Sequence, residues 1–390
     1  MHVLHVMEAT IGGTRRHLVD VALGQVSSGM RVTVVVSTLR DPGFPADLAR
    51  LEEAGVRVER LPMVRSIHPR LDLRHLRTLK RLLKELRPDV VHTHSSKAGV
   101  LGRRASMSTG IGVRIHTPHT FAFLFGALFG RAKRTLFRSI ERSLARSTDR
   151  MVAVSSSEAE TMKAAGVVDP AIVRTVPNGI DPRRIEGAQP LDVAVFGLDP
   201  DLPLAVVVGL VYSAKGQDLA IEALSVGRDL GALQILFVGP GDSAPLEARA
   251  EELGVASRIA FTGARDDVPA VLAAADFLLL PSRWEGMPYV VLEAMAASLP
   301  VVATPVDGAR DLVVDDETGY LARKIQADAI ALAMGRAVLA GKTRRQKLGA
   351  QGRARLEGAF TVDSMVMGLT EVYEEALDAH SAGAGRVMKS

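Results

Sequence analysis

The chain has 390 residues, more than one ordinary hydrophobic core requires, so two domains of about 150–200 residues are expected. It is 47% hydrophobic and 24% charged, as soluble globular proteins are, and its lack of cysteine excludes disulfides and cysteine-based metal or redox sites. The net charge of +4 is uneven: residues 1–190 carry 30 basic and 17 acidic side chains, and the remainder carries 18 and 27. The basic half indicates an anionic partner or membrane, or simply two unrelated solvated surfaces.

In the first half, short Val/Ile/Leu-rich runs alternate with amphipathic stretches. Strands are predicted at 3–6, 32–36, 57–61, 90–92, 114–117 and 151–154, and helices at 15–28, 46–54, 73–86, 99–108 and 131–145. This alternation is typical of parallel strands joined by crossover helices, so it predicts one doubly wound sheet. The first six residues match a buried strand and not a signal peptide, and no apolar run approaches the ~20 residues that span a bilayer.

The alternation restarts in the second half. Strands are predicted at 204–208, 234–238, 259–262, 277–280, 301–303 and 319–322, and helices at 218–225, 244–253, 268–274 and 289–297. The expected organisation is an N-terminal domain at 1–190, a C-terminal domain at 191–363, a helix at 364–380 packing back towards the N-terminal domain, and a disordered tail at 381–390. Two such domains predict a ligand between them, at the carboxyl ends of the strands.

The sequence PSRWEGMP at 281–288, followed by an apolar helix with Glu293, carries the strongest functional signal. Pro288 suits the first turn of a helix. Glu285 then precedes the helix, and the Gly286 and Met287 amides at its positive end can bind hydroxyl or phosphoryl oxygens. The neighbours of Glu293 are apolar, so its carboxylate needs a partner or a ligand. The two carboxylates predict binding of sugar or ribose diols; the alternative is a helix-end charge and a solvated side chain.

Two further loops each follow a buried strand and precede a helix. In VVVGLVYSAKG at 206–216, Gly209 ends the strand and Lys215 can serve as a phosphate ligand, although a solitary lysine is more often a surface residue. The Lys-Gly order excludes a P-loop. Gly12 and Gly13 lack the full Gly-x-Gly-x-x-Gly fingerprint, which disfavours a nicotinamide cofactor, but they allow an anionic ligand near the backbone.

Four of the ten histidines lie at or just beyond two strand ends, namely His92, His94, His116 and His119. A His-x-His pair can indicate a metal, but no carboxylate cluster or further spaced ligand accompanies it, so no metal site is predicted. His119, within TPHT at 117–120, is placed to meet a ligand. We interpret the other three as structural.

Taken together, these motifs resemble those of the family 4 retaining glycosyltransferases of the GT-B fold, from His5 to about Phe360. The matching motifs are GG at 12–13, DVVHTH at 89–94, HTPH at 116–119, VS at 154–155, PNGID at 177–181, KG at 215–216, VGPG at 238–241, FTG at 261–263 and the paired glutamates. Each motif is common, whereas their order and spacing are specific. The resemblance implies an α/β fold with two doubly wound Rossmann-like domains and a cleft between them.

The resemblance also implies residue roles. Lys215 would neutralise the diphosphate leaving group, His119 would lie beside the reacting centre, and Glu285 would hold donor-sugar hydroxyls. Glu293 would bind the nucleotide ribose, and His94 and Lys97 would lie on the side of the acceptor. The other implied donor-binding positions are Gly12, Gly13, Gly209, Ala264, Arg265, Arg283, Gly286, Met287 and Pro288. The family generally needs no metal, because basic side chains and helix dipoles stabilise the leaving group; no cofactor is expected, and the favoured co-substrate is a UDP-sugar.

Two positions depart from the family pattern. Five residues before the lysine the family commonly has an arginine, and this chain has Leu210. The diphosphate would lose a bidentate contact that lysine does not reproduce. Arg283 or Arg265 could compensate; otherwise activity or donor choice is affected. A smaller departure is Asp311, where the family often has glutamate.

Two basic amphipathic segments are relevant to whether the acceptor lies at a membrane. Segment 73–86 has leucines at helical spacing between basic residues, and we interpret it as an ordinary crossover helix. Segment 121–146 begins aromatic-rich and continues with apolar and arginine-bearing faces, as helices in an anionic membrane interface do. The expected membrane contacts are Phe125, Phe129, Arg134 and Arg138.

The sequence therefore predicts a glycosyltransferase that moves a sugar to a lipid-linked saccharide, as in bacterial surface-polysaccharide assembly. It would work in the cytoplasm or peripherally on the inner face of the cell membrane, without a nucleic-acid partner. A GT-B-fold nucleotide-sugar epimerase is one alternative, and it would convert donor without acceptor. A non-catalytic nucleotide-sugar-binding subunit is another, favoured by Leu210.

Overall fold

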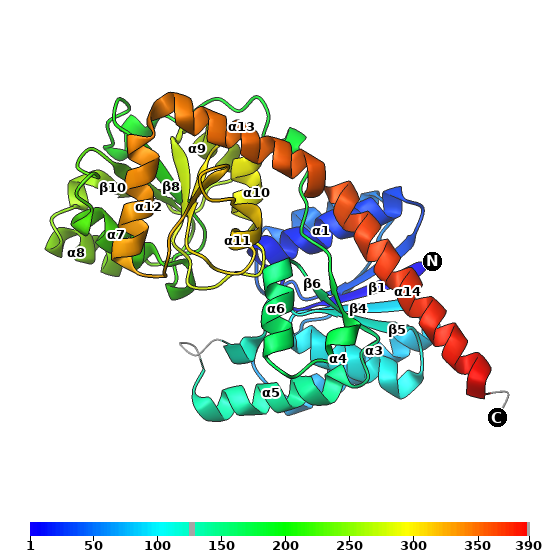
Figure 1. The fold of residues 1–390 in the computed structure, drawn as a ribbon. Coiled ribbons are helices and arrows are strands. Elements are labelled where there is room, and N and C mark those ends of the chain that lie inside the picture. Colours follow the sequence, from blue (N-terminus) through cyan, green and yellow to red (C-terminus); the bar gives the residue numbers. More distant parts are fainter. Residues whose placement is uncertain (125–128, 388–390) are drawn as a thin grey trace. The chain divides into compact units, whose positions relative to one another are not determined.

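The computed structural model describes residues 1–124 and 129–387, which form two compact units (Figure 1). Unit 1 comprises Met1–Asn178 and Val362–Ser390, and unit 2 comprises Gly179–Thr361. The division after Asn178 precedes the expected boundary at 190/191. The segment 179–190 therefore lies in unit 2.

Unit 1 contains a seven-stranded parallel sheet with the order β3-β2-β1-β4-β5-β6-β7. Its strands are β1 (His2–Met7), β2 (Arg31–Val36), β3 (Arg57–Arg60), β4 (Val90–His94), β5 (Val113–Thr117), β6 (Arg150–Ala153) and β7 (Val173–Thr175). The helices are α1 (Gly12–Ser27), α2 (Phe44–Glu53), α3 (Pro69–Leu86), α4 (Ser96–Thr109), α5 (Arg131–Ala145), α6 (Ser156–Ala164) and α14 (Val362–Val387). Short 3-10 turns span Ala122–Leu124 and Pro170–Ile172.

Helices cover both faces of this sheet because adjacent strand residues point to opposite sides. Leu4 and Val91 pack in a core with side chains of α3 and α4. Their neighbours Val3 and Val90 pack in another core with side chains of α1 and α14. In Figure 1, α14 (red) runs beside α1 (blue). The C-terminal helix is therefore part of the unit 1 core.

Helix α14 begins two residues before the expected start at 364 and ends at Val387. Positions 381–387 of the expected disordered tail are thus helical, in a stretch without proline, and 388–390 lie outside the described residues. Glu375 fastens the helix to the sheet through ion pairs with Arg150 and Arg174. The helix accordingly extends beyond its expected end.

Unit 2 contains a six-stranded parallel sheet with the order β10-β9-β8-β11-β12-β13. Its strands are β8 (Leu204–Val208), β9 (Gln234–Val238), β10 (Ile259–Phe261), β11 (Phe277–Leu280), β12 (Val301–Ala303) and β13 (Gly319–Leu321). The helices are α7 (Gln217–Val226), α8 (Ala244–Glu252), α9 (Val268–Ala274), α10 (Tyr289–Ala296), α11 (Ala309–Leu312), α12 (Ala327–Leu339) and α13 (Gly341–Ala359). The 3-10 turns are Pro182–Arg184, Val193–Phe196, Ser213–Lys215 and Ala256–Arg258.

Both sheets reverse their strand order at a switch point, between β1 and β4 in unit 1 and between β8 and β11 in unit 2. In open parallel sheets, ligands bind outside the carboxyl ends of the strands at such points. Within 1–124 and 129–387, no helix is both long enough and apolar enough to cross a membrane. A ligand site is therefore expected at the loops that follow these four strands.

Candidate functional site

In unit 2, the loops after β8 and β11 bring Lys215 and Glu285 into contact. Nζ of Lys215 lies 2.8 Å from Oε1 of Glu285, and the Ser282 hydroxyl donates to the same oxygen at 2.7 Å. The Lys215 side chain is 24% exposed and that of Glu285 is 12% exposed. An ion pair of two residues predicted as catalytic therefore lies at the switch point with part of its surface open to a ligand.

Close backbone packing holds these two loops together. Gly216 has φ 67°, and a Cβ atom there would lie 2.1 Å from the carbonyl oxygen of Pro281. Only glycine fits this approach. The Arg283 amide donates to the carbonyl of Ala214 at 2.7 Å. The position of Lys215 next to the β11 loop is thus set by the backbone.

Helix α10 begins directly after the β11 loop. Pro288 is its N-cap residue, one position before the first turn where the sequence placed it. Glu293 lies within the helix and is half-buried, whereas its neighbours Leu292 and Ala294 are buried. The other side of the loop is closed by Gly308, where a Cβ atom would lie 2.3 Å from the Gly286 carbonyl oxygen. Both glutamates that are predicted to bind the donor therefore belong to one continuous loop-helix segment.

The two arginines proposed to replace the family arginine are engaged elsewhere in unit 2. Arg283 forms two hydrogen bonds with the carboxylate of Asp218, at 2.8 and 2.6 Å. Arg265 forms two with Asp267, at 2.7 and 2.6 Å. At position 210, the leucine carbonyl accepts a hydrogen bond from the buried Gln217 at 2.9 Å. Each guanidinium thus has a carboxylate partner, as Lys215 has in Glu285.

In unit 1, Gly12 and Gly13 open helix α1 after β1. The N-cap residue is Ile11, whose side chain has no hydrogen-bond acceptor, and the first turn contains no acidic residue. Gly12 itself has φ 54°, a conformation that glycine adopts readily. The start of α1 thus has the polarity and backbone access that suit an anionic ligand.

Five buried or half-buried histidines cluster near the β1, β4 and β5 strand ends: His5, His17, His92, His94 and His119. His94 Nε2 lies 3.0 Å from His5 Nδ1, and His94 Nδ1 lies 3.4 Å from His119 Nε2. The rings of His17 and His119 meet edge to face, with centroids 4.8 Å apart. His5 and His17 join the His-x-His pair from elsewhere in the chain, which sequence spacing alone does not reveal.

Hydrogen bonds connect this histidine cluster to helix α14. His5 Nε2 lies 2.8 Å from Oε1 of Gln25, whose amide group donates to the Tyr373 hydroxyl at 3.2 Å. The Tyr373 hydroxyl also lies 2.6 Å from His92 Nδ1. The cluster is therefore held in place by side chains of α1, β1, β4 and α14.

Burial keeps these rings uncharged at neutral pH. It lowers the pKa of His5 and that of His17 to about 4, although a hydrogen bond with Asn178 acts in the opposite direction on His17. Burial, reinforced by neighbouring histidines, holds the pKa values of His92, His94 and His119 well below their usual range. Unit 1 thus has neutral imidazoles near its switch point, whereas unit 2 has an ion pair near its own.

The buried carboxylate of Glu158 supports the loop that carries His119. Both His119 (φ 49°) and Thr120 (φ 76°) have left-handed backbone conformations, which are strained for residues with side chains. Glu158 Oε1 accepts the Thr120 amide at 2.6 Å, and its Oε2 accepts the Val154 amide at 2.7 Å. Sequence reasoning missed Glu158, although it lies three residues after Ser155 of the VS motif, whose hydroxyl accepts the Glu158 amide as the N-cap of α6.

The predicted acceptor-side residue Lys97 is paired with Asp72. Its ammonium group lies 2.7 Å from both carboxylate oxygens, and its side chain is 8% exposed. His94 is fully buried within the histidine cluster. The structure therefore gives both residues close internal partners.

The predicted membrane segment lies around helix α5. Arg134 donates to the carbonyl of Phe123 at 2.8 Å and Arg138 to that of Ala165 at 2.6 Å. Phe129 packs on Phe137, while Leu136 is 49% exposed. A cavity of about 420 Å³ is lined by Phe123, Leu124, Arg131, Arg134, Thr135, Arg138, Ala164 and Ala165. Phe125 lies outside the described residues.

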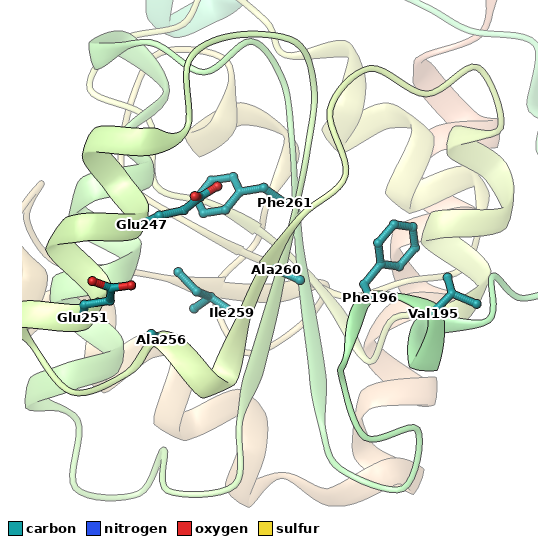
Figure 2. A pocket seen from close by; sticks show the side chains of 8 residues that line it. All are labelled: Val195, Phe196, Glu247, Glu251, Ala256, Ile259, Ala260 and Phe261. Atoms are coloured by element: carbon teal, nitrogen blue, oxygen red, sulfur yellow. The ribbon is translucent and has the colours of Figure 1, made fainter.

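A second cavity, of about 430 Å³, lies at the β10 edge of unit 2 (Figure 2). Glu247 and Glu251 of α8 border it together with Phe261, and Phe196 lies across from them (Figure 2). The remaining lining residues are Val195, Ala256, Ile259 and Ala260. The predicted site residues do not line this cavity, although Arg265 lies over the Phe196 ring.

Two family models match this sequence. The glycosyl transferase 4-like domain matches residues 12–179, and the glycosyl transferases group 1 domain matches residues 203–340. The first match lies in unit 1 apart from its last residue, and the second lies in unit 2.

Known proteins resemble the chain over most of its length. It is 29% identical over 273 residues to the UDP-Gal:alpha-D-GlcNAc-diphosphoundecaprenol alpha-1,3-galactosyltransferase of Escherichia coli, covering 68% of this chain and 70% of that protein. It is 31% identical over 313 residues to the D-inositol 3-phosphate glycosyltransferase of Nocardia farcinica, covering 76% and 69%. The structure of Anabaena Alr3699/HepE in complex with UDP and glucose has a TM-score of 0.78 and 19% identity, covering 96% of this chain and 100% of that one. The predicted GT-B fold is confirmed.

Proposed function

Because this chain belongs to the family 4 glycosyltransferases, we propose that it transfers a sugar from a nucleoside diphosphate sugar to a lipid-linked saccharide, with retention of anomeric configuration. The Escherichia coli relative is named for a UDP-sugar donor and a diphosphoundecaprenol-linked acceptor. The Anabaena structure contains UDP and glucose. Both names support a UDP-sugar donor and the first supports a lipid-linked acceptor.

The contact between Lys215 and Glu285 carries this proposal. In the proposed complex, the Lys215 ammonium turns to the diphosphate, and the Glu285 carboxylate accepts hydrogen bonds from donor-sugar hydroxyls. At 2.8 Å the two groups are close enough to reach adjacent parts of one ligand. Glu293, in the helix that follows, binds the ribose. The other positions on the donor are Gly12, Gly13, Gly209, Ala264, Gly286, Met287 and Pro288.

The leaving group depends mainly on Lys215 in this proposal. Position 210 is leucine, and Arg265 and Arg283 remain further basic positions on the donor, each paired with a carboxylate as Lys215 is. Helix N-termini supply the remaining positive potential, so the transfer step itself needs no metal ion. Arg283 contributes indirectly, because it ties the β11 loop to Asp218 and to the carbonyl of Ser213.

In unit 1, His119 lies beside the reacting centre, and His94 and Lys97 belong to the acceptor side, where the buried His94 acts through its contact with His119. His119 is the half-exposed member of a cluster whose other rings are buried, which supports its contact with a ligand. Its low pKa leaves the ring neutral, so it can accept a hydrogen bond from an acceptor or donor hydroxyl.

The lipid-linked acceptor places the protein peripherally on the inner, cytoplasmic face of the cell membrane in this proposal. The exposed Leu136 and the arginines of α5 support contact with an anionic surface. Flotation with liposomes containing anionic lipid tests this contact. Binding should weaken in R134A/R138A; binding that stays intact would count against it.

A transfer assay tests the proposed function. Purified protein is incubated with UDP-, GDP- and ADP-sugars, with and without undecaprenyl diphosphate-linked saccharides. We expect release of the nucleoside diphosphate that requires the acceptor, and a product with the anomeric configuration of the donor. Conversion of donor without any acceptor would instead identify an epimerase. Donor binding without turnover, unchanged in Glu285→Ala, would identify a non-catalytic subunit.

A further inference from the structure

Three histidines of unit 1 converge from separate parts of the sequence: His17 from α1, His94 from the end of β4 and His119 from the loop after β5. One ring nitrogen of each lies within 4.8 Å of the other two. His17 and His94 are buried and His119 is half-buried, so the group is reached from the His119 side. The protonation pattern of these rings follows from their partners.

His17 has a lone pair without a partner. Its Nδ1 lies 2.9 Å from Oδ1 of Asn178, and an amide oxygen only accepts hydrogen bonds, so Nδ1 carries the proton. Nε2 of the neutral ring then carries the lone pair. This nitrogen is buried and has no hydrogen-bond partner within the residues that the structure describes. Buried nitrogens of this kind are uncommon and call for a ligand or water.

A chain of hydrogen bonds determines which ring nitrogen of His94 carries the lone pair. The Gln25 amide group donates to Tyr373, so its oxygen faces His5 Nε2, which must be protonated. His5 Nδ1 therefore accepts a hydrogen bond from the Nε2–H of His94. His94 Nδ1 is left with a lone pair, and it faces His119 Nε2 at 3.4 Å.

The spacing of His94 and His119, and the outer contacts of His17 and His94, match those of histidines that bind metal. Two nitrogens on a tetrahedral zinc ion, each about 2.1 Å from the metal, are separated by about 3.4 Å, which is the distance between His94 Nδ1 and His119 Nε2. Metal-binding histidines also donate their other N–H to an oxygen or a similar acceptor. The Asn178 oxygen accepts the Nδ1–H of His17, and Nδ1 of His5 accepts the Nε2–H of His94.

We propose that His17, His94 and His119 form a three-histidine site for a transition-metal ion, with the fourth position open to water or another ligand. Imidazole ligands suit Zn²⁺, Ni²⁺ or Cu²⁺, whereas Mg²⁺ takes oxygen ligands. All three ligands belong to unit 1, and Lys215 and Glu285 belong to unit 2. The inference does not rest on the proposed function or on a metal ion at the diphosphate.

Direct binding to the untagged full chain tests this site. After removal of metals with a chelator, Zn²⁺ is titrated by calorimetry, and Co²⁺ by visible absorption, which distinguishes tetrahedral from octahedral coordination. We expect one equivalent to bind, with tetrahedral Co²⁺ bands. His17→Gln and His119→Gln should abolish this binding, and Asn178→Ala should weaken it roughly 10-fold or more, as loss of an outer-shell partner does.

The exposed His68 provides the matched control, and His68→Gln should bind as the wild type does. Circular dichroism checks that each variant is folded. If His17→Gln does not fold, His119→Gln and Asn178→Ala decide, because His119 is half-exposed on a loop and Asn178 is not itself a ligand. No saturable binding by the wild type, or equal binding in the folded ligand variants, would overturn the proposal.

Discussion

The two units use the same strand order around their switch points but place opposite chemistry there. In unit 1, loops after β1, β4 and β5 surround neutral histidines that are joined by hydrogen bonds. In unit 2, loops after β8 and β11 hold the ion pair of Lys215 and Glu285. The shared topology therefore sets where a site forms, while a few side chains decide which ligand group it meets.

The two sites also differ in how their side chains are held in position. The unit 2 pair is partly exposed and its position is set by backbone contacts such as that of Gly216 with Pro281. The unit 1 cluster depends on buried side chains that complete each other's hydrogen bonds, including Tyr373 and Gln25. Changes in unit 2 should hence affect turnover more than stability, and changes in the unit 1 network should affect stability as well.

The largest expected effect is on turnover, in unit 2. Lys215→Ala and Glu285→Gln should each lower the rate of transfer at least ~100-fold, the scale of losing one electrostatic stabiliser. Their thermal unfolding should change little, because the pair is partly exposed. Steady-state kinetics and calorimetry measure both quantities, with the exposed Lys324→Ala as control. Near-wild-type rates in both variants would refute the site assignment.

The next effect concerns Glu158 in unit 1. Glu158→Gln replaces one acceptor oxygen by an amide group that cannot accept the Thr120 or Val154 N–H. Losing a buried, charged acceptor should cost about 2–3 kcal/mol of unfolding free energy, and movement of the adjacent His119 should lower turnover as well. Denaturant unfolding and kinetics test this, with Glu160→Gln on the same helix as control. Unchanged stability would show that the His119 loop does not need this carboxylate.

A smaller effect is expected where α14 meets the histidine cluster. Tyr373→Phe removes the hydroxyl that contacts His92 and Gln25 and leaves both without this buried partner. The loss should lower the free energy of unfolding by about 1–2 kcal/mol. Tyr212→Phe, at a 41% exposed tyrosine of unit 2, is the control. Equal unfolding midpoints for the two variants would contradict the supporting role of this network.

The smallest effect is a pH dependence at the unit 1 surface. Hydrogen bonds and ion pairs with Arg174 and Arg150 lower the pKa of Glu375 from 4.5 to about 2. As pH falls, Glu375 therefore becomes protonated in the unfolded chain before it does in the folded protein. The stabilisation of the folded protein by Glu375 is thus present above pH 4.5 and is lost as pH falls towards 2. Unfolding midpoints of wild type and Glu375→Gln should converge over this range. A constant difference would mean that the ion pairs do not stabilise α14.

Apart from β7, the strands of both sheets could be predicted because buried parallel strands form short apolar runs. Helix α13 (Gly341–Ala359) was missed, since few of its residues are buried and its sequence is mostly polar and basic. Strand β7 (Val173–Thr175) and helix α11 (Ala309–Leu312) were missed because they are too short for a periodic pattern.

Parts of the site that belong to contiguous motifs could also be predicted, whereas contacts between distant residues could not. Glu285 and Lys215 belong to contiguous motifs, so each was found, but their contact depends on strand order, which brings the β8 and β11 loops together. His17 and Gln25 reach the histidine cluster from distant positions, and no local pattern marks them. Asn178 belongs to the PNGID motif, but the motif does not reveal its contact with His17. The partner of Arg283, Asp218, is distant as well. By contrast, Arg265 and Asp267 are two residues apart, so their pairing could have been foreseen.

The central claim is that Lys215 binds the diphosphate of the donor and Glu285 binds its sugar. Calorimetry tests this claim most directly. Affinities of the wild type, Lys215→Ala and Glu285→Gln are measured for a nucleoside diphosphate and for its sugar conjugate. We expect Lys215→Ala to weaken both ligands, since both contain the diphosphate, and Glu285→Gln to weaken only the conjugate, which contains the sugar hydroxyls. Equal losses for both ligands in Glu285→Gln, or no loss in Lys215→Ala, would contradict the account.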